Sequence, residues 1–129
     1  MHAKKITRLY DLAMKTGAPV IGLVDCAGIR LQEATDALEA FGQIYLKQTL
    51  ASGVIPQITA IFGTCGGGMA VIPSLTDFTF IGIQKMEKCS SHNQTHWKET
   101  TQTNATTAAA DFQSKETGVI DGVGTEDEY

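Results

Sequence analysis

The sequence has no cluster of lysine or arginine, since its 10 basic residues are scattered and are outnumbered by 14 acidic ones. Nucleic-acid-binding proteins usually depend on a concentrated basic field, so this composition argues against that class. There are only three cysteines, without repeated spacing, and the first residues lack the basic and apolar segments of a secretion signal. A disulfide-stabilised secreted domain is therefore not expected, and we expect a cytoplasmic protein with reduced thiols.

One long stretch lacks charge altogether, between Lys47 and Asp77. It has the length of a membrane span, but Pro56, Pro73 and the run Gly66–Gly68 interrupt it. Backbone groups freed by such residues have no hydrogen-bond partner in lipid. Apolar runs broken by glycine are instead typical of covered parallel strands, and 129 residues suffice for a single domain.

Helical and strand patterns alternate along the first 83 residues. Apolar residues recur at steps of three and four in two segments, which predicts helices over 4–16 and 31–50. The residues expected to face inward are Ile6, Leu9, Tyr10, Ala13, Leu38, Phe41, Ile44, Tyr45 and Leu50. Short apolar runs predict buried strands over 19–24, 57–62 and 77–83, with a helix beginning in 69–73 after a glycine-rich turn. This alternation predicts an α/β class with a parallel sheet and helices packed outside it.

The composition changes after residue 82. Residues 83–107 are polar, rich in Thr, Ser, Asn and Gln, and without helical or strand period, which predicts disorder. Residues 108–117 can form a helix, and 118–124 read as a short strand or turn. We therefore divide the chain into a core over 1–82, a polar tract over 83–107 and a C-terminal helix and strand of the same domain over 108–129.

Two places where a predicted strand leads into a helix could carry chemistry: residues 25–30 and 63–69. Glycine at such a point lets a ligand approach backbone amides without meeting a Cβ atom. Two such turns side by side could aim N–H groups at one oxygen, which is the arrangement of an oxyanion hole. Close packing of strand on helix is an equally good explanation of the glycines, and from physical argument alone the two remain open.

Four short motifs occur in order and resemble the carboxyltransferase subunits of biotin-dependent acyl-CoA carboxylases and the related sodium-pumping acyl-CoA decarboxylases. The family patterns are D-S-G-G-A-R-x-Q-E, S-G-V-I-P-Q-I, G-x-C-A-G-G and T-D-F. They match residues 25–33, 52–58, 63–68 and 76–78. The sequence departs from them by having Cys26 for serine, Ala27 for glycine, Ile29 for alanine and Gly66 for alanine.

The resemblance implies a partial crotonase-like (ClpP/crotonase) fold in which both glycine turns bind the thioester carbonyl of an acyl-CoA. A carboxyl group would move between the acyl α-carbon and N1 of biotin, and enolate charge would develop on the thioester oxygen. The implied backbone donors to that oxygen are Ala27, Gly28, Gly66, Gly67 and Gly68, and the implied substrate contacts are Ile29, Arg30 and Met69. For Arg30, an ion pair with Glu33 or Asp25 is at least as good an explanation.

The resemblance also implies the partners. The substrate would be of the malonyl-, methylmalonyl- or glutaconyl-CoA class, and biotin would arrive on a separate carrier protein, because no A-M-K-M attachment motif occurs here. Biotin carboxylase or membrane decarboxylase subunits would complete the system, in a homo-oligomer whose active site lies between protomers. The chain looks like an interior piece of the N-terminal half, which by itself presents half a site at most.

Other functions stay open on the residues alone. Cys26 and Cys65 flank the turns, but no histidine is near either in sequence, which argues against nucleophilic catalysis. An acyl-CoA hydrolase or isomerase would need a carboxylate base, and only Asp25 and Glu33 are close in sequence. The chain could also be an inactive remnant that binds a partner through an unpaired sheet edge and an apolar face.

A last pattern concerns possible metal ligands in the polar tract. Cys89, His92 and His96 have the residue types of a zinc site, but three ligands without a fourth make a weak motif, and we predict no metal. Read one base out of frame, codons for residues 86–100 permit the F-V-x-x-P-x-A strand that follows T-D-F in the family. We therefore interpret residues 83–106 as a frameshifted tract without an evolved function.

Overall fold

The computed structural model describes residues 2–82, 89–90, 115 and 118–124. Most of the polar tract and, apart from residue 115, the predicted helix over 108–117 lie outside these residues. Each remaining predicted element is present. The elements in order are α1 (His2–Thr16), β1 (Val20–Cys26), the 3₁₀ turn η1 (Leu31–Glu33), α2 (Ala34–Ala51), β2 (Gln57–Gly66), the 3₁₀ turn η2 (Gly67–Ala70), α3 (Val71–Ser74), β3 (Phe78–Gly82), β4 (Cys89–Ser90) and β5 (Gly122–Gly124).

The strands form one parallel sheet in the order β1-β2-β3-β5, with the short β4 paired to the far end of β2. Strand β2 is central and pairs with β1 from Val20 opposite Gln57 to Cys26 opposite Cys65. Strand β5 comes from the far end of the chain and pairs with β3. The α/β class with a parallel sheet is therefore confirmed, and residues 122–124 form part of the same sheet.

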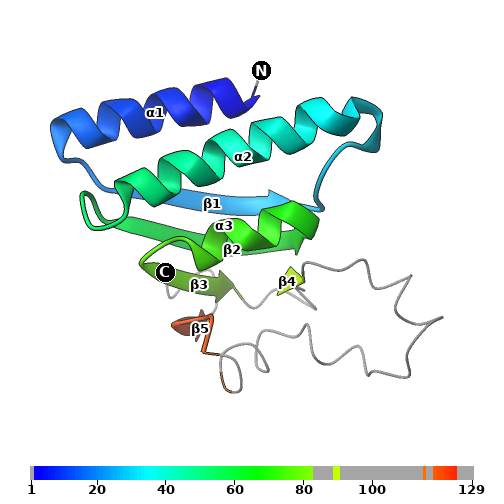
Figure 1. Cartoon of the computed structure of the whole chain (residues 1–129). Coiled ribbons are helices and arrows are strands. Elements are labelled where there is room, and N and C mark those ends of the chain that lie inside the picture. The colour runs from blue at the N-terminus through cyan, green and yellow to red at the C-terminus, as the bar shows by residue number, and fades with distance from the viewer. Residues whose placement is uncertain (1, 83–88, 91–114, 116–117, 125–129) are drawn as a thin grey trace.

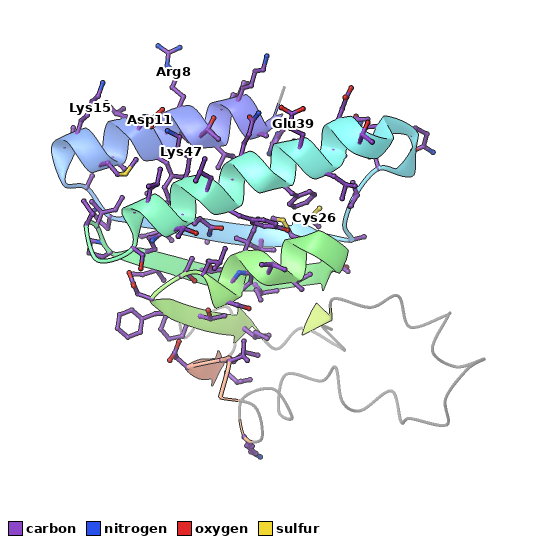
Figure 2. All side chains as sticks on the ribbon, viewed as in Figure 1. Arg8, Asp11, Lys15, Cys26, Glu39 and Lys47 are labelled. Carbon is purple, nitrogen blue, oxygen red and sulfur yellow. The ribbon has the colours of Figure 1, made fainter. Side chains whose placement is uncertain are left out.

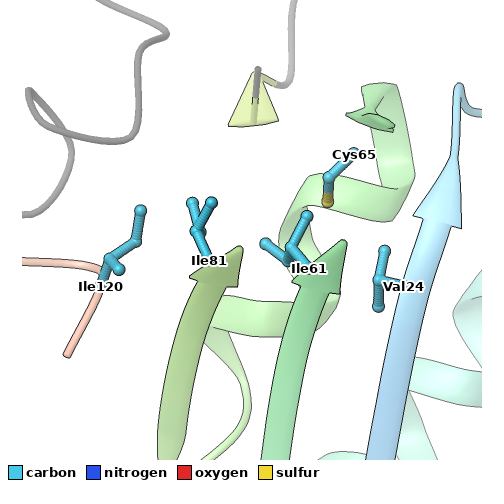
Figure 3. Packing of buried hydrophobic residues seen from close by; sticks show 5 residues of the cluster. All are labelled: Val24, Ile61, Cys65, Ile81 and Ile120. Atoms are coloured by element: carbon cyan, nitrogen blue, oxygen red, sulfur yellow. The ribbon is translucent and has the colours of Figure 1, made fainter. Parts of the chain in front are cut away.

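The three helices cover one face of the sheet, with α1 beside α2 and α3 below α2 (Figure 1). A buried cluster lies between the sheet and α3, formed by Val24, Ile61, Cys65, Ile81 and Ile120 (Figure 3). A second cluster, formed by Tyr10, Ala13, Ala51 and Ile55, joins α1 to the end of α2. Lys47 of α2 also donates to the Asp11 carboxylate of α1 at 2.5 Å (Figure 2).

Three of the residues expected to face inward are wrong predictions. Leu9, Leu38 and Leu50 are 61%, 59% and 55% exposed. Ile44 is buried as expected, and the other buried positions of α2 are Ala37, Gln48 and Ala51. The apolar residues of α2 surround more than half of the helix, so periodicity alone does not say which of them meets the sheet.

The opposite face of the sheet is apolar and exposed among the described residues. Ile21 and Leu23 of β1 are 63% and 72% exposed, and Phe78 of β3 is 52% exposed. Their register partners Ile58 and Ala60 lie on the same face of β2. The prediction that β1 is a buried strand is therefore correct only for the face under the helices, because α1, α2 and α3 all lie on that side.

None of the described helices is both long enough and apolar enough to cross a bilayer. The uncharged stretch after Lys47 contributes instead to α2, β2 and α3, as expected from its proline and glycine residues.

Two aspartates fix the register of the sheet by the same pair of hydrogen bonds. Asp77 precedes β3, donates its N–H to the Gln57 carbonyl at 2.9 Å and accepts the Gln57 N–H on its carboxylate at 2.8 Å. Asp121 precedes β5 and makes both bonds with Thr79, at 2.9 and 2.7 Å. Each aspartate thus ties the start of its own strand to the neighbouring strand, which explains its place in T-D-F and in Val-Ile-Asp-Gly.

We expect Asp77→Ala and Asp121→Ala each to lower the free energy of unfolding by about 1.5–3 kcal/mol, because each removes a charged acceptor from a strand N–H. The matched controls are Asp77→Asn and Asp121→Asn, which keep an oxygen acceptor and should lose clearly less. Urea titration followed by circular dichroism measures the difference. Equal losses in the alanine and asparagine variants would contradict the role given to these acceptors.

Candidate active site

The two turns singled out in the sequence lie at the ends of neighbouring strands. The pairing of β1 with β2 is regular up to Val24 opposite Ile61, and the next pair is Cys26 opposite Cys65. Between these two pairs, β2 has three residues (62–64) where β1 has one (Asp25), which is a β-bulge. Strand β2 continues beyond the bulge to Gly66. The prediction that the strand gives way to a turn at Gly63 is wrong, because the bulged segment stays paired.

The side chain of Asp25 crosses this bulge. Its carboxylate accepts the backbone N–H of Thr64 at 3.0 Å. A Cβ atom on Gly63 would lie 2.2 Å from that carboxylate oxygen, so the side chain occupies the space that any other residue would need. Asp25 and Gly63 thus form a matched pair that holds the two strand ends together.

Beyond the bulge the two turns meet backbone against backbone. A Cβ on Gly28 would lie 3.1 Å from the Gly66 carbonyl oxygen, and a Cβ on Gly66 would lie 2.6 Å from the Ala27 carbonyl oxygen. Gly28 also has a φ of 124°, which side-chain-bearing residues rarely adopt. The close approach expected from the sequence is therefore present, and it excludes a side chain on either glycine.

Tyr45 of α2 supports the second turn from behind. Its hydroxyl donates to the carbonyl oxygen of Gly68, and burial raises the pKa of this hydroxyl above its ordinary value of 10.0. A Cβ on Gly68 would lie 3.0 Å from that hydroxyl and 3.8 Å from the ring of Phe41. The sequence predicts only that Tyr45 lies on the inward face of its helix, because nothing in the spacing of the residues links α2 to the turn.

The two cysteines stand next to the turns. Cys26 ends β1 beneath α2 and α3, where its thiol donates to the Gly28 carbonyl at 3.5 Å (Figure 2). Cys65 is fully buried and packs with Val24 and Ile61 (Figure 3).

The implied substrate contacts lie in different surroundings. Arg30 is 3.7 Å from Glu33, with side chains 82% and 59% exposed, so the ion pair weighed for it in the sequence is present. Such an exposed pair contributes little to stability. Met69 packs against the buried cluster under α3, and Ile29 is half-buried beside the first turn.

Within residues 2–82, 89–90, 115 and 118–124 there is no group of three or more His, Cys, Asp or Glu residues placed to hold a metal. His92 and His96 of the polar tract lie outside those residues. The chemistry available at the turns is that of peptide N–H groups, with one carboxylate already bound to Thr64.

Comparison with known proteins identifies related chains. The sequence profile of the carboxyl transferase domain matches residues 1–127. The chain is 54% identical over 81 residues to the methylmalonyl-CoA decarboxylase subunit alpha of Propionigenium modestum, covering 63% of this chain and 16% of the relative. It is 51% identical over 80 residues to the human mitochondrial propionyl-CoA carboxylase beta chain, covering 62% and 15%. The chain thus spans about a sixth of the length of these relatives.

Solved structures agree with the sequence comparison. A transcarboxylase 12S hexamer, solved with hydrolysed methylmalonyl-coenzyme A bound, superimposes with a TM-score of 0.86 at 28% identity, over 98% of this chain and 25% of that one. The beta subunit of geranyl-CoA carboxylase from P. aeruginosa superimposes with a TM-score of 0.82 at 22% identity, over 97% and 24%. The partial crotonase-like fold implied by the motifs is confirmed by these similarities.

Tyr45→Phe removes the hydroxyl that donates to the Gly68 carbonyl. We expect this variant to speed amide hydrogen exchange at residues 67–71 and to lower the free energy of unfolding by about 1 kcal/mol. Tyr10→Phe is the matched control, since Tyr10 is buried in the cluster that joins α1 to the end of α2 and makes no contact of its own with Gly68 in the hydrogen bonds of the described residues. Faster exchange at 67–71 in both variants would mean that the turn responds to overall stability and not to Tyr45.

The raised pKa values of two tyrosines predict how stability changes in alkali. Burial raises the pKa of Tyr45, and burial, partly offset by a hydrogen bond with Gln48, raises the pKa of Tyr10. Each phenol therefore ionises more easily in the unfolded chain, so stability is full below pH 10 and falls as the pH rises beyond it. Urea midpoints between pH 8 and 11 should fall less steeply in the double variant Tyr10→Phe, Tyr45→Phe; an unchanged slope would refute this assignment.

Proposed function

The chain belongs to the carboxyl transferase domain family, and from that premise we propose that it forms the acyl-CoA half of a carboxyltransferase site. In this proposal the turn of residues 27–28 and the turn of residues 66–68 bind the thioester carbonyl oxygen of the substrate. Carboxyl transfer itself would take place in a larger subunit, of which this chain supplies one part.

The observation that supports the proposal is the contact between Gly28 and Gly66. Two backbone turns that approach so closely leave no Cβ atom between their peptide groups and an incoming carbonyl. Packing of strand on helix does not account for Gly28 and Gly66, because the atoms nearest to a Cβ on either glycine belong to the other turn and not to a helix. The Tyr45 hydroxyl on the Gly68 carbonyl adds a second element that keeps the peptide groups of residues 68 and 69 in one orientation.

Breaking or forming the bond between a carboxyl group and the carbon next to a thioester places negative charge on the thioester oxygen. Fixed N–H donors stabilise that charge as it develops, by about 3 kcal/mol for each donor. The proposed donors are the backbone N–H groups of Ala27, Gly28, Gly66, Gly67 and Gly68. No side-chain acid or base is needed, which agrees with a site whose one nearby carboxylate, Asp25, already accepts the Thr64 N–H.

The relatives suggest the substrate class. Their names specify methylmalonyl-CoA and propionyl-CoA, and one solved neighbour holds hydrolysed methylmalonyl-coenzyme A. We therefore propose methylmalonyl-CoA and propionyl-CoA as the pair of carboxylated and decarboxylated substrates. Biotin on a separate carrier protein would be the second substrate, and a biotin carboxylase or a membrane decarboxylase subunit would use the same carrier.

The exposed apolar face of the sheet supports the requirement for a larger assembly. Ile21, Leu23 and Phe78 are more than half exposed on strands whose other face lies under the helices. Several such side chains on one sheet face favour contact with further protein. A function as an interaction piece without chemistry is the alternative that this face supports, and acyl-CoA binding separates the two.

The test uses the whole 129-residue chain and propionyl-CoA labelled with ¹³C at the thioester carbonyl. We expect binding to move the carbonyl resonance downfield, because hydrogen bonds polarise the C=O group. Free coenzyme A should bind more weakly than the thioester. If the carbonyl resonance does not move when the protein is added to saturation, the proposed oxyanion contact is wrong.

Gly28→Ala should weaken propionyl-CoA binding at least tenfold, since its Cβ would press on the Gly66 carbonyl and its φ is unfavourable. Gly42→Ala is the matched control, because Gly42 lies within α2 with open space around it. This control should leave binding unchanged and raise the free energy of unfolding by about 0.5–1 kcal/mol. Circular dichroism separates loss of binding from loss of fold.

Activity measurements distinguish the reaction classes. With methylmalonyl-CoA and free biotin, formation of propionyl-CoA would support carboxyl transfer, whereas release of free coenzyme A would indicate thioester hydrolysis. Binding without either product would agree with a chain that needs the remainder of the subunit for turnover.

A further inference from the structure

We propose that Cys26 and Cys65 form a disulfide when the protein meets a peroxide, and that this bond links the two turns of the site. The two residues are register partners across β1 and β2. Both carry thiols in the structure, and both lie on the sheet face that the helices cover.

The geometry of the strand ends permits this bond. Neighbouring strands run ~4.8 Å apart, and bridged cysteines have Cα atoms ~4.4–6.8 Å and Cβ atoms ~3.8 Å apart. The two strand ends would therefore need to approach by about 1 Å at their Cβ atoms. Cys26 is the last residue of β1 and directly follows the bulge, so this movement is not opposed by a regular ladder on both sides.

The different exposure of the two thiols sets the order of the steps. Cys26 is half-buried and can be reached by a small oxidant, whereas Cys65 is 0% exposed. Hydrogen peroxide would convert the Cys26 thiol into a sulfenic acid with release of one water. The Cys65 sulfur would then attack the Cys26 sulfur, and the bond to hydroxyl would break with loss of a second water. Two thiols are oxidised and one peroxide is reduced to two waters.

The cysteine pair Cys26 and Cys65 occurs in this chain but is not part of the family pattern. The family pattern has serine at the position of Cys26, so a chain that follows the pattern has one cysteine at these two positions. The third cysteine, Cys89, lies at the register position on the other side of Cys65. Strand β4 contributes only two residues, whereas β1 pairs with β2 over its whole length, and we therefore assign the bond to Cys26.

The bond would change the site. It would draw residue 26 toward residue 65, while the two turns are already so close that a Cβ on Gly66 would lie 2.6 Å from the Ala27 carbonyl oxygen. The turn of residues 27–28 would therefore have to move relative to that of residues 66–68. Weaker acyl-CoA binding in the oxidised chain follows from the proposed function, whereas the bond itself does not depend on that function.

Trypsin separates the three cysteines, since cleavage at Lys15, Arg30, Lys47, Lys85, Lys88 and Lys98 places them in peptides 16–30, 48–85 and 89–98. The full chain is treated with hydrogen peroxide, alkylated and digested without reduction. We expect the count of titratable thiols to fall from three to one and peptides 16–30 and 48–85 to be joined, with recovery by dithiothreitol. The rate should not depend on protein concentration.

Two variants keep the proposal open to refutation. Cys89→Ser should form the bond as readily as the parent chain, and Cys26→Ser, which introduces the residue of the family pattern, should form none between these peptides. A bond from peptide 48–85 to 89–98, a bond that forms only between molecules, or oxidation of Cys26 to sulfinic acid without a bond would overturn the proposal.

The effect on binding is measured separately. Oxidised parent chain should bind propionyl-CoA more weakly than reduced chain, and oxidised Cys26→Ser should bind like its reduced form. If the bond forms but reduced chain does not bind propionyl-CoA, the disulfide stands and the proposed function fails. If the reduced chain binds propionyl-CoA but no disulfide forms, the proposed function stands and the disulfide proposal fails.

Discussion

The contact of two peptide backbones at the ends of β1 and β2 is the constraint on which the candidate site depends. It requires glycine at positions 28 and 66, since a Cβ on either would press on a carbonyl oxygen of the other turn. It also requires the bulge that carries β2 past the end of β1, and the Asp25 carboxylate that binds the Thr64 N–H across that bulge. Strand pairing, bulge and glycines together bring two segments about 40 positions apart in the chain to one place.

This arrangement favours chemistry by fixed dipoles over chemistry by titrating side chains. A hydrolase or isomerase that uses a carboxylate base would need Asp25 or Glu33. The first accepts a backbone N–H that holds the strand ends, and the second is exposed beside Arg30. Peptide N–H groups held by a rigid sheet and supported by Tyr45 need no reorganisation as charge develops, which is the condition for effective electrostatic stabilisation. The proposed carboxyl transfer next to a thioester fits that condition better than general-base catalysis does.

The sheet explains why the chain resembles one part of a larger protein. Its helices bury one face, and the exposed Ile21, Leu23 and Phe78 leave the other face apolar. The chain matches about a sixth of the length of its relatives, and it superimposes almost completely on a quarter of the transcarboxylase chain. Asp77 and Asp121 nevertheless fix the register of strands from both ends of the chain, so β5 belongs to the same sheet as β1.

Local sequence determined most of the elements, because helices and strands follow from short-range periodicity and from the stop signals of glycine and proline. It also marked both turns, since glycine is needed wherever backbones meet. Only the tertiary structure decided which side of α2 is buried: Gln48 faces inward while Leu50 faces out, because the helix packs on α1 and the sheet at once. The bulge after Val24, the Asp25 bond to Thr64 and the support of Gly68 by Tyr45 join residues that are distant in sequence. No local pattern encodes such contacts, because they arise only when the parallel strands and α2 have been brought together.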